Sequence, residues 1–289
     1  MPFLKGAAMR HFAVIGHPVA HSRSPFIHQA FAAQFGHRLR YSKLHAAPGS
    51  FNDVLDAFRA GGGAGLNITL PFKLEAFERC TFKSARALAA GAVNTLVFSD
   101  DAIEGDNTDG IGLVNDIEGR LGLKLRGRAV LMLGAGGAAR GALGPLQEAG
   151  CARLTVANRS LSRAAGLGTE VCGLEELGPK LRSEGAWDLV INATSAGLSA
   201  QTLPIDAQVL AEADLVYDMV YAAQPTDFLK RALALGARQT SDGLGMLVAQ
   251  AAEAYRLWQG VTPNVAPVYA ALRASLSGAA LGQADGPSR

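Results

Sequence analysis

The chain has 289 residues, of which 49% are hydrophobic and 18% are charged, and its formal net charge at pH 7 is +2. This length and composition suit one large or two modest folded domains and exclude an intrinsically disordered chain. The small net charge excludes a strong global field for nucleic acid or an anionic membrane, and no apolar run is long enough to predict a membrane-spanning helix.

Strands and helices alternate along the first part of the chain. The predicted strands are residues 11–15, 39–44, 64–68, 92–97 and 102–105, and the predicted helices are residues 25–35, 50–60, 71–79 and 84–90. Residues 108–121 follow as another helix, with Thr108 placed to serve as its N-cap. Alternation of this kind predicts a parallel sheet covered by helices.

A second alternating block starts at the apolar strand 129–133, which is followed by the glycine-rich sequence GAGGAARG and a helix to about residue 149. Further strands are predicted at 153–157, near 187–191 and near 214–218, the last helices at 225–235, 244–258 and 264–276, and a disordered tail at 282–289. The restart of the pattern predicts a second α/β unit.

The loop GHPVAHSRSP, residues 16–25, ends where a helix is predicted to begin. Ser24 precedes Pro25, which is the favoured order of an N-cap and a first helical residue. Ser22 and Ser24 then present two hydroxyls beside unpaired helix amides, an arrangement that binds a carboxylate or another small anion. For Ser24 alone, a simple cap without a ligand is the better interpretation.

The segment NITLPFK, residues 67–73, repeats this arrangement, with Pro71 predicted to begin a helix. Lys73 then falls in the first helical turn, where the positive end of the helix dipole disfavours an ammonium group and makes proton exchange near neutral pH easier. Asp109 offers a carboxylate to orient this lysine. Asn94, predicted in mid-strand, needs a partner or a ligand for its amide. The alternative for Lys73 is an exposed lysine without a chemical role.

Four glycines, Gly134, Gly136, Gly137 and Gly141, open the helix after the strand 129–133. Small residues there let the backbone approach a pyrophosphate, and the helix N-terminus offers unpaired amides and the positive end of the dipole. The order of strand, glycines and helix favours a dinucleotide site over a tight turn without a ligand.

The next strand ends at Asn158, Arg159 and Ser160, and Arg163 follows four residues after Arg159. No carboxylate stands where it would bind the ribose of NAD and repel a 2′-phosphate. The i, i+4 spacing predicts both arginines on one helix face, with Ser160 capping that helix, and so predicts NADP. Solvated helix charges are the alternative.

Metal and disulfide chemistry find little support in the sequence. All six histidines lie within the first 45 residues, but no spacing of histidine and carboxylate supports a metal site, and we predict none. Cys80, Cys151 and Cys172 are far apart, which favours a reducing compartment over a disulfide framework or a zinc site. The first 16 residues lack the apolar core of a secretory signal, and Met9 is an alternative start.

Nine motifs together resemble the shikimate dehydrogenase family, from about Phe12 to Ala271. In chain order they are GHPVAHSRSP (16–25), NITLPFK (67–73), GAVNT (91–95), DNTDG (106–110), GAGGAARG (134–141), NRS (158–160) with Arg163, NATSAG (192–197), DMVY (218–221) and DGLGMLVAQ (242–250). The resemblance implies a cytoplasmic oxidoreductase of aromatic amino-acid biosynthesis. Its reaction would be the reversible, NADP-dependent reduction of 3-dehydroshikimate to shikimate.

The resemblance also implies roles for single residues. Lys73 would be the acid and base, paired with Asp109. The implied substrate-binding residues are Ser22, Ser24 and Tyr221 for the carboxylate, Thr69, Asn94, Asp109 and Gln250 for the ring hydroxyls, and Lys73 for the reacting oxygen. The implied cofactor-binding residues are Gly134, Ala135, Gly136, Gly137, Ala138, Asn158, Arg159, Ser160, Arg163, Thr194, Met219, Gly243 and Met246, with Gly243 and Met246 at the nicotinamide.

The fold that the resemblance implies is α/β with two domains and a cleft between them. Residues 1–109 would form the substrate domain, completed by C-terminal helices in 244–289, and residues 110–243 a Rossmann-like NADP domain. Ala222 and Ala223 follow Tyr221 where many members carry Asn-Pro, which leaves that loop's shape open. The implied partner is a small substrate, with no nucleic acid or membrane, in a monomer or homodimer.

Three alternatives remain open at this point. A quinate/shikimate dehydrogenase paralogue would also accept quinate and use NAD or NADP; Ser22, Ser24 and the arginine pair disfavour it. A non-catalytic NADP-binding regulatory protein would be expected to have lost Lys73 or Asp109, and both are present. A folate-type dehydrogenase with a similar two-domain plan finds no support in the HSRSP and DNTDG elements.

Overall fold

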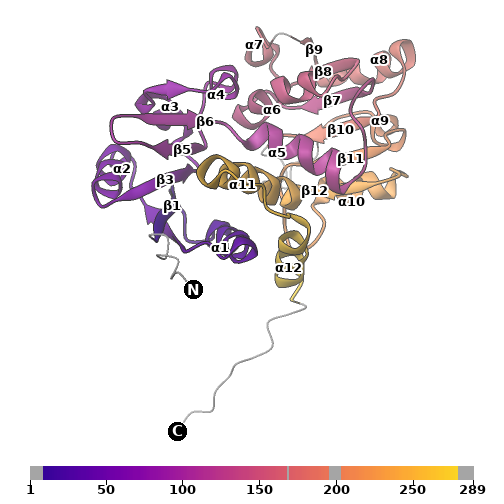
Figure 1. Cartoon of the computed structure of the whole chain (residues 1–289). Helices are drawn as coiled ribbons and strands as arrows, with labels where there is room; N and C mark the ends of the chain where they lie inside the picture. Colours follow the sequence, from indigo (N-terminus) through magenta and orange to yellow (C-terminus); the bar gives the residue numbers. More distant parts are fainter. Residues whose placement is uncertain (1–8, 168, 195–202, 279–289) are drawn as a thin grey trace.

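The computed structural model describes residues 9–167, 169–194 and 203–278, which form two six-stranded sheets with helices around them (Figure 1). The first sheet contains β1 (Arg10–Gly16), β2 (Leu39–His45), β3 (Gly63–Ile68), β4 (Phe82–Lys83), β5 (Thr95–Phe98) and β6 (Ile103–Asp106). Their order across the sheet is β2-β1-β3-β5-β6-β4. The predicted tail, 282–289, lies outside the described residues.

The first sheet is mixed. Strand β1 pairs in parallel with β2 and β3, whereas β5 runs antiparallel to β3 and to β6. The prediction of a wholly parallel sheet is therefore wrong at β5. For the β5–β6 pair the physical reason is the tight turn between these strands, in which the Ser99 amide bonds to the Ala102 carbonyl at 3.1 Å. A turn this short can join only antiparallel neighbours.

The helices of this half match the predicted ones closely. They are α1 (Ser24–Phe35), α2 (Phe51–Ala60), α3 (Lys73–Arg79) and α4 (Ala85–Ala90). α1 ends at Gly36 in the left-handed conformation, with φ of 65°. The prediction that Pro71 begins a helix is wrong, because Leu70–Phe72 form a turn, with the Phe72 amide bonded to the Thr69 carbonyl, and α3 starts at Lys73.

The second sheet is wholly parallel, as predicted. It contains β7 (Ala129–Leu133), β8 (Arg153–Ala157), β9 (Glu170–Cys172), β10 (Leu189–Asn192), β11 (Leu215–Asp218) and β12 (Thr240–Asp242), in the order β12-β11-β10-β7-β8-β9. This is the Rossmann strand order, whose reversal beside the first strand creates a ligand-binding crevice at the carboxyl ends. The sequence did not predict β9 and β12, which have three residues each.

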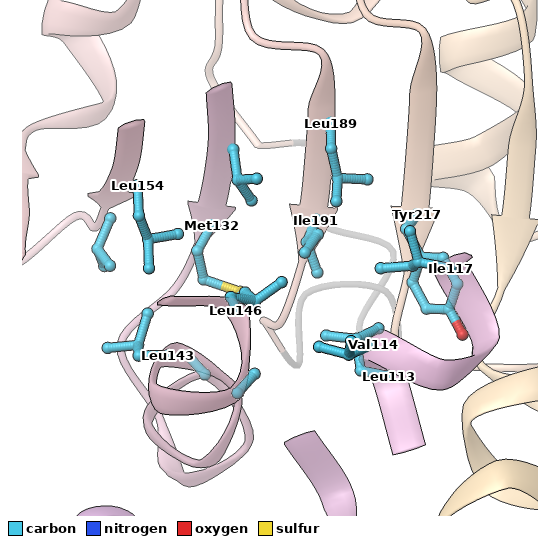
Figure 2. Packing of buried hydrophobic residues seen from close by; sticks show 14 of the residues in the cluster. Leu113, Val114, Ile117, Met132, Leu143, Leu146, Leu154, Leu189, Ile191 and Tyr217 are labelled. Carbon is cyan, nitrogen blue, oxygen red and sulfur yellow. The ribbon is translucent and has the colours of Figure 1, made fainter. Parts of the chain in front are cut away.

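Helices cover both faces of this sheet, and two separate apolar cores lie beneath them. The helices are α5 (Asp109–Asn115), continued by the π-helical η1 (Asp116–Arg120), then α6 (Gly137–Glu148), α7 (Leu161–Ala164), the 3-10 turn η2 (Leu174–Glu176), α8 (Leu177–Glu184), α9 (Ala207–Ala211) and α10 (Asp227–Ala234). Figure 2 shows side chains of α5, η1 and α6, such as Leu113, Ile117 and Leu146, packed on Met132 and Ile191 of one face.

Two C-terminal helices follow, α11 (Leu244–Gln259) and α12 (Ala266–Leu276), and in Figure 1 α11 lies between the two sheets. At its far end Trp258 stacks on Phe12 of β1, with ring centroids 4.4 Å apart, and its indole donates to the Leu96 carbonyl at 3.0 Å. No helix within the described ranges has both the length and the apolar character needed to cross a membrane.

α5 touches both α6 and α11 through glycines. A Cβ atom at Gly110 would lie 2.1 Å from the Gly141 carbonyl oxygen in α6. A Cβ atom at Gly112 would lie 2.6 Å from the backbone nitrogen of Gln250 in α11. Such contacts are too short for any side chain. The backbone of α5 therefore packs directly against a helix of each half of the molecule.

Candidate active site

A cavity of about 360 Å³ lies where the ends of β1 and β3 face the beginning of α11. Among the residues that line it are all those expected to bind the substrate: Ser22, Ser24, Thr69, Lys73, Asn94, Asp109, Tyr221 and Gln250. Three of the expected cofactor residues, Met219, Gly243 and Met246, also line it. The cavity therefore joins the two groups of residues that the sequence singled out separately.

Lys73 and Asp109 form the central ion pair of this cavity. The Lys73 Nζ atom lies 2.5 Å from Asp109 Oδ2, and the two side chains are 28% and 17% exposed. Each is the first residue of its helix, α3 or α5. An ammonium group at a helix N-terminus is disfavoured by the dipole, whereas a carboxylate there is favoured. The carboxylate thus stabilises the lysine in a position that α3 alone would disfavour.

Asn94 holds the second oxygen of this carboxylate. Its Nδ2 atom donates to Asp109 Oδ1 at 2.8 Å, and its Oδ1 atom accepts from the Thr108 amide at 2.9 Å. The prediction that Asn94 lies in mid-strand is wrong, because it directly precedes β5. The expectation that its amide needs partners is confirmed. Thr108 occupies the predicted N-cap position of α5, but its hydroxyl bonds to Asn94 instead of capping.

Gln250 connects α11 with this network. Its Oε1 atom lies 3.4 Å from Asn94 Nδ2 and 3.3 Å from the Thr108 hydroxyl, and its Nε2 atom donates to the Leu247 carbonyl. Asn67, which the sequence analysis missed, lies next to this network and bonds to Thr95. It accepts from the Tyr41 hydroxyl at 2.7 Å and donates to the Thr95 hydroxyl at 3.1 Å. The sequence feature that could have pointed to Asn67 is a polar residue inside an otherwise apolar strand.

Ser22 and Ser24 also line the cavity. The prediction that Ser24 is the N-cap of α1 is wrong, since Ser24 is the first helical residue and Arg23 occupies the cap position. Instead, the Ser22 hydroxyl oxygen lies 3.3 Å from the Ser24 amide and 3.2 Å from the Ser24 hydroxyl. Burial raises the pKa of Tyr221, with Arg23 opposing the shift. Tyr221 is therefore a neutral hydrogen-bond donor at physiological pH.

The glycine loop lies at the carboxyl end of β7, beside the reversal of strand order. Gly134 has φ of 105°, and a Cβ atom there would lie 2.9 Å from the Thr194 methyl group, so only glycine fits this turn. Gly136 and Gly137 are exposed, face open space, and begin α6 without a side-chain cap or an acidic residue in the first turn. These exposed amides fit the pyrophosphate of a dinucleotide.

The basic segment after β8 differs from its prediction. Arg159 precedes the four-residue α7, whereas Arg163 lies within it, so the two do not share a helix face. Ser160 occupies the N-cap position, but its hydroxyl contacts the Ser162 hydroxyl and does not cap. Both arginines are exposed and lack a carboxylate partner among the described ion pairs, as a site for a 2′-phosphate requires. Asn158 bonds to the Ser160 carbonyl at 2.7 Å.

Arg140, which the sequence analysis missed, connects this segment with the glycine loop. Its guanidinium donates to the Ala135 carbonyl at 3.3 Å and to the Arg163 carbonyl at 2.6 Å. The expectation of no metal stays a prediction. Across residues 9–167, 169–194 and 203–278, no three histidine, cysteine or acidic side chains gather in a way that could hold a metal ion.

Comparison with known proteins gives matches along most of the chain. Three family models match: a shikimate dehydrogenase substrate binding domain over residues 14–96, shikimate / quinate 5-dehydrogenase over 117–222 and a shikimate 5′-dehydrogenase C-terminal domain over 243–273. The shikimate dehydrogenase (NADP(+)) of Bordetella avium is 49% identical over 283 residues, covering 93% of this chain and 97% of that protein.

Solved structures agree with these matches. An Ael1 enzyme from Pseudomonas putida superposes with a TM-score of 0.86 at 44% identity, covering 91% of this chain and 98% of that one. The shikimate 5-dehydrogenase of Thermus thermophilus, solved in complex with NADP(H) and shikimate, superposes with a TM-score of 0.82 at 34% identity, covering 93% and 100%.

Proposed function

The chain belongs to the shikimate dehydrogenase family, and we propose that its cavity carries out the reversible, NADP-dependent reduction of 3-dehydroshikimate to shikimate. The observation that carries this proposal is the Lys73–Asp109 pair, which faces the same cavity as Met219, Gly243 and Met246. A proton donor and the expected nicotinamide face thus share one space, as reduction of a ketone to an alcohol requires.

Lys73 and Asp109 carry the proton chemistry. Bound NADPH supplies the hydride, and the ketone oxygen gains negative charge as the hydride arrives. The Lys73 ammonium stabilises that charge and donates a proton to the oxygen, and it takes the proton back from the hydroxyl in the reverse direction. Asp109 holds the ammonium at the cavity wall, and Asn94 fixes Asp109 through its other oxygen.

The remaining cavity side chains orient the substrate. The hydroxyls of Ser22, Ser24 and Tyr221 bind its carboxylate, because each can donate a hydrogen bond and the Ser24 amide lies at the start of α1. Thr69, Asn94, Asp109 and Gln250 bind the ring hydroxyls. Placing the carboxylate and the ketone at opposite ends of the cavity fixes which carbon faces the nicotinamide.

The second half of the chain holds the dinucleotide. The amides of Gly136, Gly137 and Ala138 bind the pyrophosphate, and the guanidiniums of Arg159 and Arg163 bind the 2′-phosphate. The other residues in this role are Gly134, Ala135, Asn158, Ser160, Thr194, Met219, Gly243 and Met246. The absence of a carboxylate among them favours NADP over NAD.

The proposed domain boundaries separate most of the substrate-binding residues from most of the cofactor-binding residues. Residues 1–109 with 244–289 form the substrate domain, and 110–243 form the cofactor domain. The contacts of α11 with β1 and β5 through Trp258 support this assignment. We further propose that the protein acts in the cytoplasm as a monomer or homodimer, without nucleic acid or membrane partners.

Steady-state turnover of purified protein tests the proposal. Oxidation of shikimate and of quinate is measured with NADP and with NAD, and the highest kcat/KM is expected for shikimate with NADP. Comparable kcat/KM for quinate, or a preference for NAD, would instead identify a quinate/shikimate dehydrogenase of broader specificity. No turnover with any of the four combinations would contradict the proposed activity.

A further inference from the structure

Tyr217 of β11 is buried in the core of the second sheet, yet its hydroxyl group has two polar partners. The ring packs in the cluster that Figure 2 shows, where it lies next to Ile117 of η1. The hydroxyl lies 2.8 Å from Asp116 Oδ2 and also accepts a bond of 3.3 Å from the Met246 amide in α11. This one oxygen therefore connects β11, η1 and α11.

Asp116 determines which way this hydroxyl donates. Its side chain is 2% exposed, and both of its oxygens accept from the Arg120 guanidinium, at 2.6 and 2.8 Å. A carboxylate paired with arginine can only accept, so the Tyr217 hydrogen must point to Asp116. A lone pair of the Tyr217 oxygen is then directed to Met246. Burial holds the pKa of Tyr217 well above its usual value, so this phenol stays protonated.

The beginning of α11 packs directly on the same carboxylate. A Cβ atom at Gly245 would lie 1.9 Å from Asp116 Oδ1, so the backbone of this first turn is in contact with Asp116. The first-turn amides of a helix have no partner within the helix. Here the Leu244 amide bonds to Asp242 Oδ1 at 3.2 Å, and the Met246 amide bonds to Tyr217. Two buried side chains thus fix the backbone that carries Met246.

We infer that Tyr217 is a positioning residue for hydride transfer, which sets the position of Met246 in the cavity by binding its amide. The inference rests on the proposed function, in which Met246 contacts the nicotinamide. Met246 lines the cavity, whereas Tyr217 does not and reaches it only through the backbone of α11. Displacement of that backbone moves the expected nicotinamide contact while leaving Ser22, Ser24 and Lys73 in place.

The test is Tyr217→Phe, which removes the hydroxyl and keeps the buried ring. Tyr255→Phe is the matched control, because Tyr255 is also fully buried and loses a single side-chain bond, to His37 at 2.6 Å, near the other end of α11. Y217F removes both bonds of the hydroxyl, to Asp116 and from Met246. We expect kcat to fall roughly five- to tenfold, as loss of the one bond that holds the Met246 amide allows. The KM for shikimate should stay within about twofold of wild type.

A kinetic isotope effect separates positioning from a general loss of stability. With NADPH deuterated at the transferred hydrogen, Y217F should show a larger isotope effect on kcat than wild type and Y255F, because a misplaced nicotinamide slows the hydride step itself. Wild-type kcat and isotope effect in Y217F would overturn the inference. So would equal changes in Y217F and Y255F, which indicate a structural role only.

Two further measurements keep the test informative. Amide hydrogen exchange at Met246, followed by NMR on the full chain, should be faster in Y217F than in wild type, and unchanged exchange would contradict the bond to Tyr217. In Asp116→Asn an NH2 group replaces one carboxylate oxygen and faces either Arg120 or the Tyr217 hydrogen, so kcat should fall and exchange at Met246 should become faster. If Y217F fails to fold, wild-type values of both quantities in this variant would contradict the inference. If wild type itself lacks activity, the proposed function fails while the exchange experiment still tests this bond.

Discussion

The two sides of the proposed site differ in how their residues are held. On the substrate side, Lys73, Asp109, Asn94 and Gln250 are wholly or partly buried and bonded to one another. On the cofactor side, the glycine-loop amides and the arginines after β8 are exposed and have few side-chain partners among the described residues. Buried groups that are hydrogen-bonded to one another are held in one geometry, as catalytic groups must be. Exposed groups without partners are available to bind a ligand. Substitutions at Lys73 and its bonded partners should therefore change mainly kcat, and substitutions on the cofactor side should change mainly the affinity for the cofactor.

Lys73→Ala gives the largest expected effect and tests the chemical side of this contrast. Loss of the proton donor should lower kcat by at least about 100-fold while the KM for shikimate changes little. Steady-state kinetics with shikimate and NADP measure both values. Lys83→Ala is the control, since Lys83 is a partly buried lysine of the same half outside the cavity, and its kcat should stay within about twofold. Wild-type kcat in K73A would remove Lys73 from the mechanism.

The double variant Arg159→Gln/Arg163→Gln tests the affinity side. Loss of two charged contacts to a 2′-phosphate should raise the KM for NADP roughly 30- to 100-fold, with kcat at saturating NADP within about threefold. The KM for NAD should not change. The exposed Arg182→Gln serves as the control. If kcat fell as far as KM rose, the proposed division between chemistry and binding would be wrong.

His28, a buried residue of the substrate side, gives a smaller expected effect, on how the stability of the protein depends on pH. It is fully buried and stacks on Tyr41, and neither ring nitrogen has a hydrogen-bond partner among the residues that the structure describes. Burial lowers its pKa to about 3. In the unfolded chain this histidine has its ordinary pKa of about 6.5, so as the pH falls below 6.5 a proton binds to the unfolded chain but not to the folded one. Protonation of His28 therefore leaves the free energy of unfolding unchanged above pH 6.5 and decreases it as the pH falls from 6.5 toward 3. Between pH 8 and pH 5 the loss is about 2 kcal/mol.

Urea unfolding at pH 8 and pH 5 measures this loss. The free energy of unfolding should differ between the two pH values by about 2 kcal/mol less in His28→Phe than in wild type. In the control His21→Gln, which removes an exposed histidine, this difference should stay as in wild type. An unchanged difference in H28F would show that another group carries the acid sensitivity.

Tyr221→Phe gives the smallest expected effect and sharpens the comparison within the substrate side. Tyr221 lies at the opposite end of the cavity from the proton chemistry in the proposed function, so removing its hydroxyl should raise the KM for shikimate about three- to tenfold. The value of kcat should remain within about twofold. A kcat loss as large as that of K73A would place Tyr221 at the reacting carbon.

Local patterns in the sequence predicted much of this molecule. The apolar strand β7, the glycines after it and the start of α6 are neighbours along the chain, so a short window contained their whole signal. The cavity residues Lys73, Asp109 and Gln250 were also singled out, because each belongs to a motif of the family. Strands as short as β9 and β12 show too few residues for any alternation to be visible.

Features that depend on contacts between distant segments could not be predicted. Asn94 was expected inside a strand, but its hydrogen bonds to Thr108 and Asp109 accompany a position just before β5. The Tyr217–Met246 bond joins two residues 29 positions apart, and neither residue type signals it. Arg159 was expected on a helix because its spacing from Arg163 fits one, yet α7 begins only after it.

The bare backbone of α5 has a consequence for how this protein can vary. Gly110 and Gly112 let α6 and α11 pack against the same short helix, so the spacing of these helices from α5 depends on the absence of a side chain at both positions. An alanine at Gly110 would push α6 away from α5, and one at Gly112 would push α11 away. Both neighbours of α5 carry proposed site residues, the glycine loop at the start of α6 and Met246 and Gln250 in α11, so either substitution would displace residues of the proposed site.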